Sequence, residues 1–311
     1  MYQDQTIHSL GRVQRLAYIS LCLIWGSTWL AIRFVVRDVP PFLAASIRFF
    51  IAAGVLLVPV FFHKERWPKH DSQWNALLVL GFTMFAIPYG LIFWAEQHIK
   101  SSLTAVLFSA NPLIVALLTP VMMHRKVPRP AVFAMVVAFG GIFALLYTDV
   151  PLSGNTLLGA LAVLSATFVS AWSVVFAKKR LHDLDTVFAT GVQMLIGAIG
   201  LLWATWAFEK HKPVSWTGPA IGALVFLAVV GSATAFAVYY WLLKSMQPYQ
   251  LSTTSLLVPA IAVLEGVLIG NEGASVSMLV ATMVVLGSVG VALRADPNES
   301  AVTLPLREGD G

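Results

Sequence analysis

The sequence predicts an all-α integral membrane protein of ten transmembrane helices, arranged as two inverted five-helix repeats. Composition is the first reason: 58% of the 311 residues are hydrophobic and only 11% are charged. A soluble domain of this length could not bury so much apolar surface without long charged helix faces. The second reason is the length of the apolar runs, about 18 to 24 residues each, which is what a helix needs to cross roughly 30 Å of hydrocarbon.

The third reason is an internal repeat. When the chain is aligned with itself at an offset of 147 residues, rare residue types coincide without a gap. The coinciding pairs are Trp25 with Trp172, Arg33 with Arg180, Asp38 with Asp185, Trp94 with Trp241, Pro112 with Pro259 and Gly140 with Gly287. Each half holds five spans, an odd number, so the second half has to enter the bilayer upside down relative to the first. Inverted repeats of this kind are typical of alternating-access transporters.

The apolar runs, separated by short connections rich in proline and glycine, place the ten helices along the chain. They are expected near residues 16–36, 41–62, 74–95, 103–123, 130–147, 156–177, 185–208, 218–243, 250–270 and 275–293. We therefore expect a cytoplasmic N-terminal segment at 1–15, a first repeat at 16–147, a second repeat at 156–293 and a disordered cytoplasmic tail at 294–311.

Lysine and arginine residues fall mostly on one side of the predicted membrane. The side that holds both termini carries fourteen of them, whereas the opposite side carries only Arg33, Arg37, Lys100, Lys210 and Lys212. By the positive-inside rule, both termini are predicted to lie in the cytoplasm, with the chain in the inner membrane. The basic pI of about 9.4 then reflects membrane orientation, and no nucleic-acid partner is expected.

Other features of the sequence exclude several classes of protein. Cys22 is the only cysteine, so a disulfide framework and a thiolate metal site are excluded. All seven histidines fall in loops, tails or helix ends, so no mid-span pair exists to ligate haem, and no metal or cofactor is expected. The sequence contains no HExxH, GxSxG or Walker motif, which argues against a hydrolase or an ATPase. The apolar run at 16–36 is too long for a signal peptide.

Aromatic residues follow equivalent faces of the third and eighth spans. At helical spacing, Phe85, Tyr89 and Phe93 of the first repeat correspond to Ser232, Phe236 and Tyr240 of the second. These residues predict either an aromatic-walled central cavity for a small amphipathic or cationic solute, or bundle packing and lipid contact. On the first interpretation the wall comprises Trp25, Thr28, Trp29, Tyr89, Phe93, Asn111, Trp172, Phe176, Tyr239, Tyr240 and Ser255.

Two prolines interrupt the fourth and ninth spans. Pro112 follows Asn111 near the middle of the fourth span, and its repeat partner Pro259 follows a run of Thr and Ser that includes Ser255. A proline frees a backbone carbonyl, and asparagine is rarely left facing lipid. The pair predicts either two hinged helices whose backbone lines the solute path, or tolerated kinks.

Charged residues inside the spans are few. Arg48 lies about 10 Å from the outer end of the second span, and Glu265 about 8 Å from the outer end of the ninth, at a rise of 1.5 Å per residue. A lone charge in hydrocarbon is costly, so we expect the two to pair or to line a polar vestibule. Glu265 is then the candidate proton-coupling carboxylate. The alternative is a static ion pair or snorkelling to the surface.

Several motifs resemble those of a known family. They are Ile24-Trp25-Gly26-Ser27-Thr28-Trp29, Pro41 followed by Arg48-Phe49, the run from Glu96-Gln97-His98-Ile99 to Ala110-Asn111-Pro112-Leu113, Val258-Pro259, and Gly270-Asn271-Glu272. Over about residues 16–293 the chain resembles the EamA-type branch of the drug/metabolite transporter superfamily. The resemblance implies a protein that moves amino acids, other small metabolites or drugs across the inner membrane, often outward. Where many members place a glutamate before the ninth-span proline, this chain has Val258, and a glutamate stands instead at Glu265.

The predicted function is a secondary transporter, an exporter of small metabolites such as amino acids or related amphipathic or cationic compounds, working by alternating access. The alternative is a membrane-embedded enzyme or sensor for a lipid-like ligand. Spans 2 and 7 are expected to act as gates. Spans 5 and 10 carry small residues and almost no polar ones, so they are expected to brace the bundle and to offer a face for a homodimer.

Overall fold

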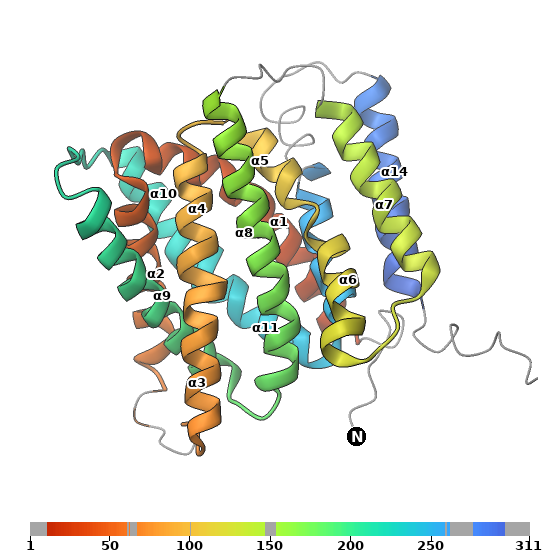
Figure 1. Cartoon of the computed structure of the whole chain (residues 1–311), viewed down its shortest axis with the longest axis horizontal. Helices are drawn as coiled ribbons and strands as arrows, with labels where there is room; N and C mark the ends of the chain where they lie inside the picture. Colours follow the sequence, from red (N-terminus) through yellow and green to blue (C-terminus); the bar gives the residue numbers. More distant parts are fainter. Residues whose placement is uncertain are drawn as a thin grey trace, which may run out of the picture.

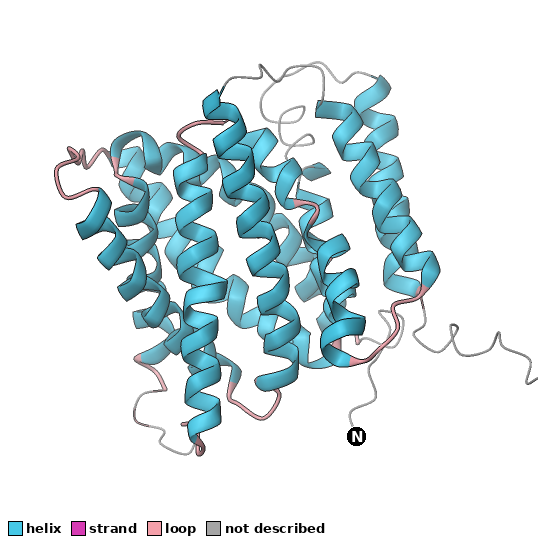
Figure 2. Cartoon of the chain, viewed as in Figure 1, coloured by secondary structure: helices cyan, strands magenta, loops and turns pink. Residues whose placement is uncertain are grey.

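The computed structural model describes residues 11–60, 62, 67–99, 101–146, 154–258, 260–261 and 276–295. These residues form a bundle of helices joined by short loops, and no strand occurs among them (Figure 2). Within this part of the chain, six helices are long and apolar enough to cross a membrane, and three more apolar helices are shorter. The all-α membrane class that the sequence predicted is therefore confirmed.

The first repeat begins with one long helix, and its third and fourth spans are each divided into shorter helical segments. Its elements are α1 (Arg12–Asp38), α2 (Pro41–Leu57), α3 (Asp71–Leu80), the π-helical η2 (Gly81–Ala86), α4 (Ile87–Ala95), α5 (Ser101–Phe108), α6 (Asn111–Met123) and α7 (Arg129–Leu146). The second helix was predicted to reach residue 62, but it ends at Leu57, because Pro59 has no N–H group to continue the hydrogen-bond ladder.

The second repeat follows the same plan. Its elements are α8 (Gly154–Arg180), α9 (Thr186–Phe208), α10 (Gly218–Ala228), the π-helical η4 (Val229–Thr234), α11 (Ala235–Ser245), α12 (Pro248–Ser252) and α14 (Val276–Arg294). After α12 the chain is helical again up to Val258. Pro259, Glu265 and the tail from residue 296, on which several predictions rest, lie outside the described residues.

The two repeats are inverted and pack as equivalent pairs. The first helices of the two repeats, α1 and α8, run in opposite directions (Figure 1). The second helices, α2 and α9, pack against each other, and so do the fifth, α7 and α14. Each first helix contacts the third span of the other repeat: α8 packs on α4, and α1 packs on α10 and α11. The bundle therefore has the approximate two-fold arrangement expected of inverted repeats.

Each third-position span is widened by one π-helical turn. The spans 71–95 and 218–245 are continuous, but they carry η2 and η4 in their middle. The two turns occupy equivalent places in the two repeats, since shifting Gly81–Ala86 by 147 residues falls within one residue of Val229–Thr234. Such turns are frequent at functional sites, because they redirect the side chains that follow and loosen the backbone ladder.

The fourth span breaks directly before Asn111. The helix α5 ends at Phe108, two turn residues follow, and α6 starts at Asn111 with Pro112 in its first turn. Proline suits this position because the first N–H groups of a helix have no intrahelical acceptor. The break turns the side chain of Asn111 inward, where its Nδ2 donates to the carbonyl of Thr167 on α8 at 3.3 Å.

Polar contacts join the helix ends on the face where α1 begins, which we call the amino-terminal face. Lys178 near the end of α8 donates from Nζ to the carbonyls of Leu243 and Met246 at 2.8 and 2.9 Å. Gln250 at the start of α12 donates from Nε2 to the carbonyl of Leu293 at the end of α14. These bonds satisfy carbonyl groups that a helix end leaves without partners.

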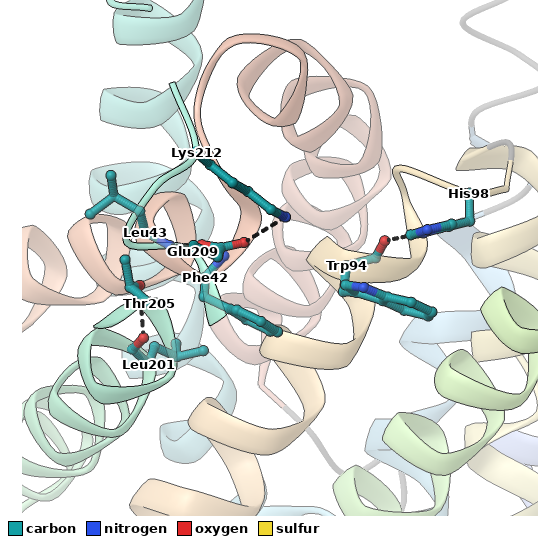
Figure 3. A network of polar contacts seen from close by, with 8 residues as sticks. All are labelled: Phe42, Leu43, Trp94, His98, Leu201, Thr205, Glu209 and Lys212. Atoms are coloured by element: carbon teal, nitrogen blue, oxygen red, sulfur yellow. Dashed lines mark hydrogen bonds and ion pairs between the residues drawn. The ribbon is translucent and has the colours of Figure 1, made fainter. Parts of the chain in front are cut away.

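On the opposite face, two carboxylates connect helices of the two repeats. Oε2 of Glu209, just after α9, accepts from the backbone N–H groups of Phe42 and Leu43 at 3.0 and 3.2 Å. Lys212 approaches Oε1 of the same carboxylate at 3.4 Å (Figure 3). Asp38 at the end of α1 accepts a short hydrogen bond from Thr217, the N-cap of α10. Both contacts join the first repeat to the second.

The helices α7 and α14 lie together at one edge of the bundle (Figure 1). Ala134 and Ala138 of α7 are buried within the chain, so part of the small-residue face serves contacts inside the protein. Gly287 on α14 has open space beside it. The homodimer remains a prediction.

Candidate functional site

A cavity of about 80 Å³ lies where the two repeats meet. Its wall is built from α1, α2, η2, α4, the break between α5 and α6, α8, α11 and the segment that follows α12. The lining residues are Trp25, Thr28, Trp29, Ile32, Arg48, Met84, Pro88, Tyr89, Ile92, Phe108, Asn111, Ser170, Val174, Phe236, Tyr239, Ser252, Thr254, Ser255 and Val258.

Aromatic rings from both repeats form one side of this wall. The ring centroid of Trp25 on α1 lies 5.3 Å from that of Phe236 and 5.2 Å from that of Tyr239, both on α11. Phe236 also contacts the rings of Phe85 and Tyr89, at 4.8 and 6.2 Å. These separations are those of favourable aromatic pairs, so the rings hold one another in place and leave a preformed apolar surface.

Four polar groups of the lining residues have no hydrogen-bond partner among the described residues. Two are nitrogen atoms that are fully buried, Nε1 of Trp25 and Nη1 of Arg48. The other two are the hydroxyl groups of Tyr89 and Tyr239. A buried donor without a partner costs about 1–3 kcal/mol. Native proteins rarely keep several such donors side by side, unless a water or a ligand satisfies them.

Arg48 is the charged residue of the wall, and its side chain is 1% exposed. Its Nε donates to Oγ of Ser232 at 2.6 Å and its Nη2 to the carbonyl of Gly231 at 3.3 Å, both within the π-helical turn η4. The guanidinium carbon lies 4.9 Å from the ring centroid of Tyr89, 5.3 Å from that of Phe49 and 5.8 Å from that of Phe93. Cation–π attraction from three rings thus offsets part of the cost of burying this charge.

Hydroxyl groups gather at the α12 side of the cavity. Ser252, Thr254 and Ser255 each donate to a backbone carbonyl three residues earlier, at 2.8 to 3.0 Å. Each hydroxyl oxygen keeps acceptor capacity after this donation, because a hydroxyl has one donor and two lone pairs. The wall therefore presents donors near Arg48 and Trp25, and acceptors near α12.

The structure brings together most, but not all, of the predicted site residues. Eight of them line the cavity: Trp25, Thr28, Trp29, Arg48, Tyr89, Asn111, Tyr239 and Ser255. Phe93 contacts the guanidinium of Arg48 from behind the wall. Pro112 is buried in the first turn of α6, next to the wall.

Three predicted wall residues point elsewhere. Trp172 and Phe176 on α8 stack on each other with centroids 4.8 Å apart and do not line the cavity. Tyr240 donates from its hydroxyl to Oε1 of Gln193 and lines a second cavity. Equivalent helices of the two repeats are rotated differently about their axes, because they pack on different neighbours. Equivalent residues of the two repeats therefore do not both reach the cavity.

The second cavity, of about 340 Å³, lies at the amino-terminal face. Its lining includes four basic residues, Arg125, Lys178, His182 and Lys244. It also includes Tyr240, the chain neighbour of Tyr239. Lys178 and Lys244 already donate to backbone carbonyls. This cavity therefore adds positive charge to one entrance of the bundle.

Several lining residues were not predicted from the sequence. Ile32, Ile92, Phe108 and Val174 are ordinary apolar residues, and nothing in the sequence distinguishes them from the rest of the core. Phe236 was recognised in the predicted aromatic face as the repeat partner of Tyr89, but it was not included in the predicted wall.

Inverted helical repeats around a partly polar cavity define a membrane transport protein. Comparison with known proteins agrees with this class. The model of the EamA-like transporter family matches residues 15–147 and 157–294. The chain therefore belongs to the EamA-like transporter family, and the predicted resemblance is confirmed.

Similar proteins carry names of the same kind. The chain is 25% identical over 271 residues to the uncharacterized transporter YoaV of Bacillus subtilis (strain 168), covering 87% of this chain and 93% of YoaV. It is 27% identical over 258 residues to the uncharacterized inner membrane transporter YedA of Escherichia coli (strain K12), covering 82% of each. A solved crystal structure has the same fold, with a TM-score of 0.75 at 20% identity, covering 90% of this chain and 96% of that one. These relatives indicate a multi-pass inner membrane transporter of small solutes.

Proposed function

We propose that the chain is a secondary transporter that exports small amphipathic metabolites, amino acids among them, across the inner membrane by alternating access. The observation that carries the proposal is the cavity between the repeats, where an aromatic surface surrounds polar groups without partners. An aromatic surface suits the apolar body of a solute, while convergent donors and acceptors fix its polar group. Both termini are placed in the cytoplasm by the distribution of basic residues.

The size of the cavity fits a site that opens and closes. About 80 Å³ is the volume of roughly three water molecules, far below the 300 Å³ or more of a site holding a drug-sized ligand. A solute therefore enters only when the two repeats move apart on one side. On one face Glu209 accepts from Phe42, and on the amino-terminal face Gln14 donates from Nε2 to Oγ of Ser245 at 3.3 Å, so each face has a bond between the repeats to break on opening.

The arrangement of helices assigns mechanical roles. The helices α2 and α9 pack against each other, and α2 carries Arg48 of the cavity wall, so we assign this pair the gating movement. The pair α7 and α14 at the edge braces the halves. The chain has no nucleotide-binding motif, so an ion or solute gradient supplies the energy. A coupling role for Glu265, together with Pro259 as a hinge, remains a prediction.

Uptake into proteoliposomes tests the proposal. Purified full-length protein is reconstituted, and saturable flux is measured for a labelled panel of amino acids, their amides and their amines. We expect saturable flux for at least one member, reduced about tenfold or more by Trp25→Ala and Tyr239→Ala. The matched control is Trp172→Ala, the repeat partner of Trp25, which lies off the cavity and keeps the flux. Equal loss in both tryptophan variants would contradict the cavity, and absence of flux for every member would contradict transport.

A further inference from the structure

We infer that the solute carries a single carboxylate that binds the guanidinium of Arg48, and that the site rejects cations. The inference rests on the proposed function, since it names the solute class of the same cavity. It starts from the hydrogen bonds of Arg48. The two groups that it bonds, Ser232 and Gly231, are adjacent in η4, and they occupy the side of the guanidinium formed by Nε and Nη2.

The other end of the guanidinium has no partner among the residues that the structure describes. Nη1 is buried and has no hydrogen-bond partner within the described part of the chain. Nη1 carries two N–H groups and Nη2 has one more to offer, so together they form a fork that matches the two oxygens of a carboxylate. Because Arg48 lines the cavity, this fork belongs to the space that a solute would fill.

The charge balance of the wall points to an anion. Arg48 forms no ion pair with any described residue, and no described lining residue is acidic. A buried cation without a counter-ion is costly in hydrocarbon, whereas a bound carboxylate would neutralise it. A cationic solute, which the sequence alone allowed, would meet at short range a positive charge that no described residue of the wall compensates. A dianion such as a phosphate ester would need more than the one full charge that the wall provides.

The repeat comparison shows that the fold itself does not need an arginine here. The equivalent position on α9 is Leu195, and α2 and α9 occupy equivalent places in the bundle. An apolar residue thus satisfies the same packing role in the second repeat. The positive charge at residue 48 is a departure from the repeat symmetry, and it stands in the wall of a cavity that both repeats line with aromatic rings.

The aromatic neighbours complete the recognition. Tyr89 stacks near the guanidinium, and its hydroxyl, like that of Tyr239, has no described partner. Trp25, Phe236 and Tyr239 form an apolar surface on the same wall. A solute with a carboxylate at one end and an apolar or aromatic body at the other would satisfy both features at once.

A head-group series on one body tests the inference in the wild-type protein. The probes are 3-phenylpropionate, 3-phenylpropanamide, 3-phenylpropylamine and phenylalanine, measured as labelled uptake into proteoliposomes and as thermal stabilisation in detergent. We expect the two carboxylates to bind and be transported, with the amide and the amine weaker by about 10- to 100-fold. Equal or better transport of the amide or the amine would overturn the carboxylate assignment while leaving the transporter proposal standing. Absence of saturable flux for all four probes, and for the wider panel, would overturn both.

Variants at residue 48 separate charge from structure. Arg48→Met should abolish the preference for carboxylate over amide, because both head groups then meet an apolar wall. Arg48→Lys should retain part of the preference, because a point charge remains without the fork. The matched control is Leu195→Met at the equivalent position, which should change neither. Unchanged head-group selectivity in a folded Arg48→Met protein would overturn the role of this residue, and the wild-type series decides the carboxylate class if that variant fails to fold.

Discussion

The hydroxyl of Tyr240 donates a 2.8 Å hydrogen bond to Oε1 of Gln193, joining α11 to α9 inside the bundle. Gln193 is fully buried, and its Nε2 in turn donates to the carbonyl of Ala189 at 2.9 Å. The adjacent Tyr239 faces the central cavity, so neighbouring tyrosines serve a structural contact and a candidate site. In a low-dielectric interior a satisfied pair of this kind holds two helices at a fixed rotation.

Removing the hydroxyl of Tyr240 should therefore destabilise the protein more than removing that of Tyr239. Tyr240→Phe leaves Oε1 of Gln193 buried without its donor, and we expect a loss of about 1–3 kcal/mol in the free energy of unfolding. Tyr239→Phe removes a hydroxyl that has no described partner, so its effect on stability should be small. Unfolding followed by circular dichroism in mixed micelles measures both. A double variant Tyr240→Phe/Gln193→Leu that recovers part of the loss would confirm the pair, and additive losses would argue against it.

Close helix contact at Gly197 gives a second prediction. A Cβ atom at this position would lie 2.5 Å from Cβ of Phe85 and 3.0 Å from the carbonyl oxygen of Gly81, both in η2. Gly197→Ala should destabilise the bundle by about 1–3 kcal/mol, because a backbone atom cannot move aside as a side chain can. Gly222→Ala on α10 is the matched control, since nothing lies within 4 Å of its added Cβ. Equal melting temperatures for the two variants would contradict the packing of α9 on η2.

The carboxylate of Glu209 gives a pH dependence. Burial raises the pKa of Glu209, and the N–H groups of Leu43 and Phe42 and the nearby Lys212 offset only part of this (Figure 3). The folded protein thus binds more protons than the unfolded chain above the ordinary carboxyl pKa, so this residue's contribution to stability falls as pH rises through its raised pKa. Relative to Glu209→Gln, the melting temperature of the wild type should fall between about pH 4 and pH 7. A relative rise over this interval would show that the N–H donors outweigh burial.

Orientation can be read from single cysteines. In a Cys22→Ala background, Lys126→Cys lies in the loop between α6 and α7, and Lys210→Cys in the loop between α9 and α10; both positions are exposed. A membrane-impermeant maleimide added to intact cells should label residue 210 and leave residue 126 unlabelled until the cells are opened, as the positive-inside rule requires. The reverse pattern would place the termini outside.

Much of the fold could be predicted because the bilayer simplifies the problem. Apolar runs of spanning length and a repeat with an odd number of spans are enough to predict ten helices and their inversion. The π-helical turns were not predictable, since Gly81–Ala86 and Val229–Thr234 show no composition that separates them from an ordinary helix. Pro112 predicted either a hinge or a tolerated kink in the fourth span, and the structure has a break there, with α6 starting at Asn111.

The site was harder, because sequence spacing gives the depth of a residue and not the rotation of its helix against its neighbours. Arg48 was placed at the right span but expected in an outer vestibule, whereas it lines the central cavity. Trp172 was expected to match Trp25, but it stacks on Phe176 instead. Trp25 on α1 and Trp172 on α8 occupy equivalent positions of the two repeats. The packing of α1 and α8 against different partners decides that Trp25 reaches the cavity and Trp172 does not.

The paired wide turns η2 and η4 also record the history of the chain. A π-helical turn arises from the insertion of one residue into an α-helix, and it is rare. Two separate insertions at equivalent places are far less economical than one insertion copied by gene duplication. The turn was therefore present in a five-helix ancestor, before the two halves were fused. Such an ancestor could assemble this bundle only as a dimer of identical subunits inserted in opposite orientations, and the difference between Arg48 and its counterpart Leu195 arose after the duplication, when the two halves were free to differ.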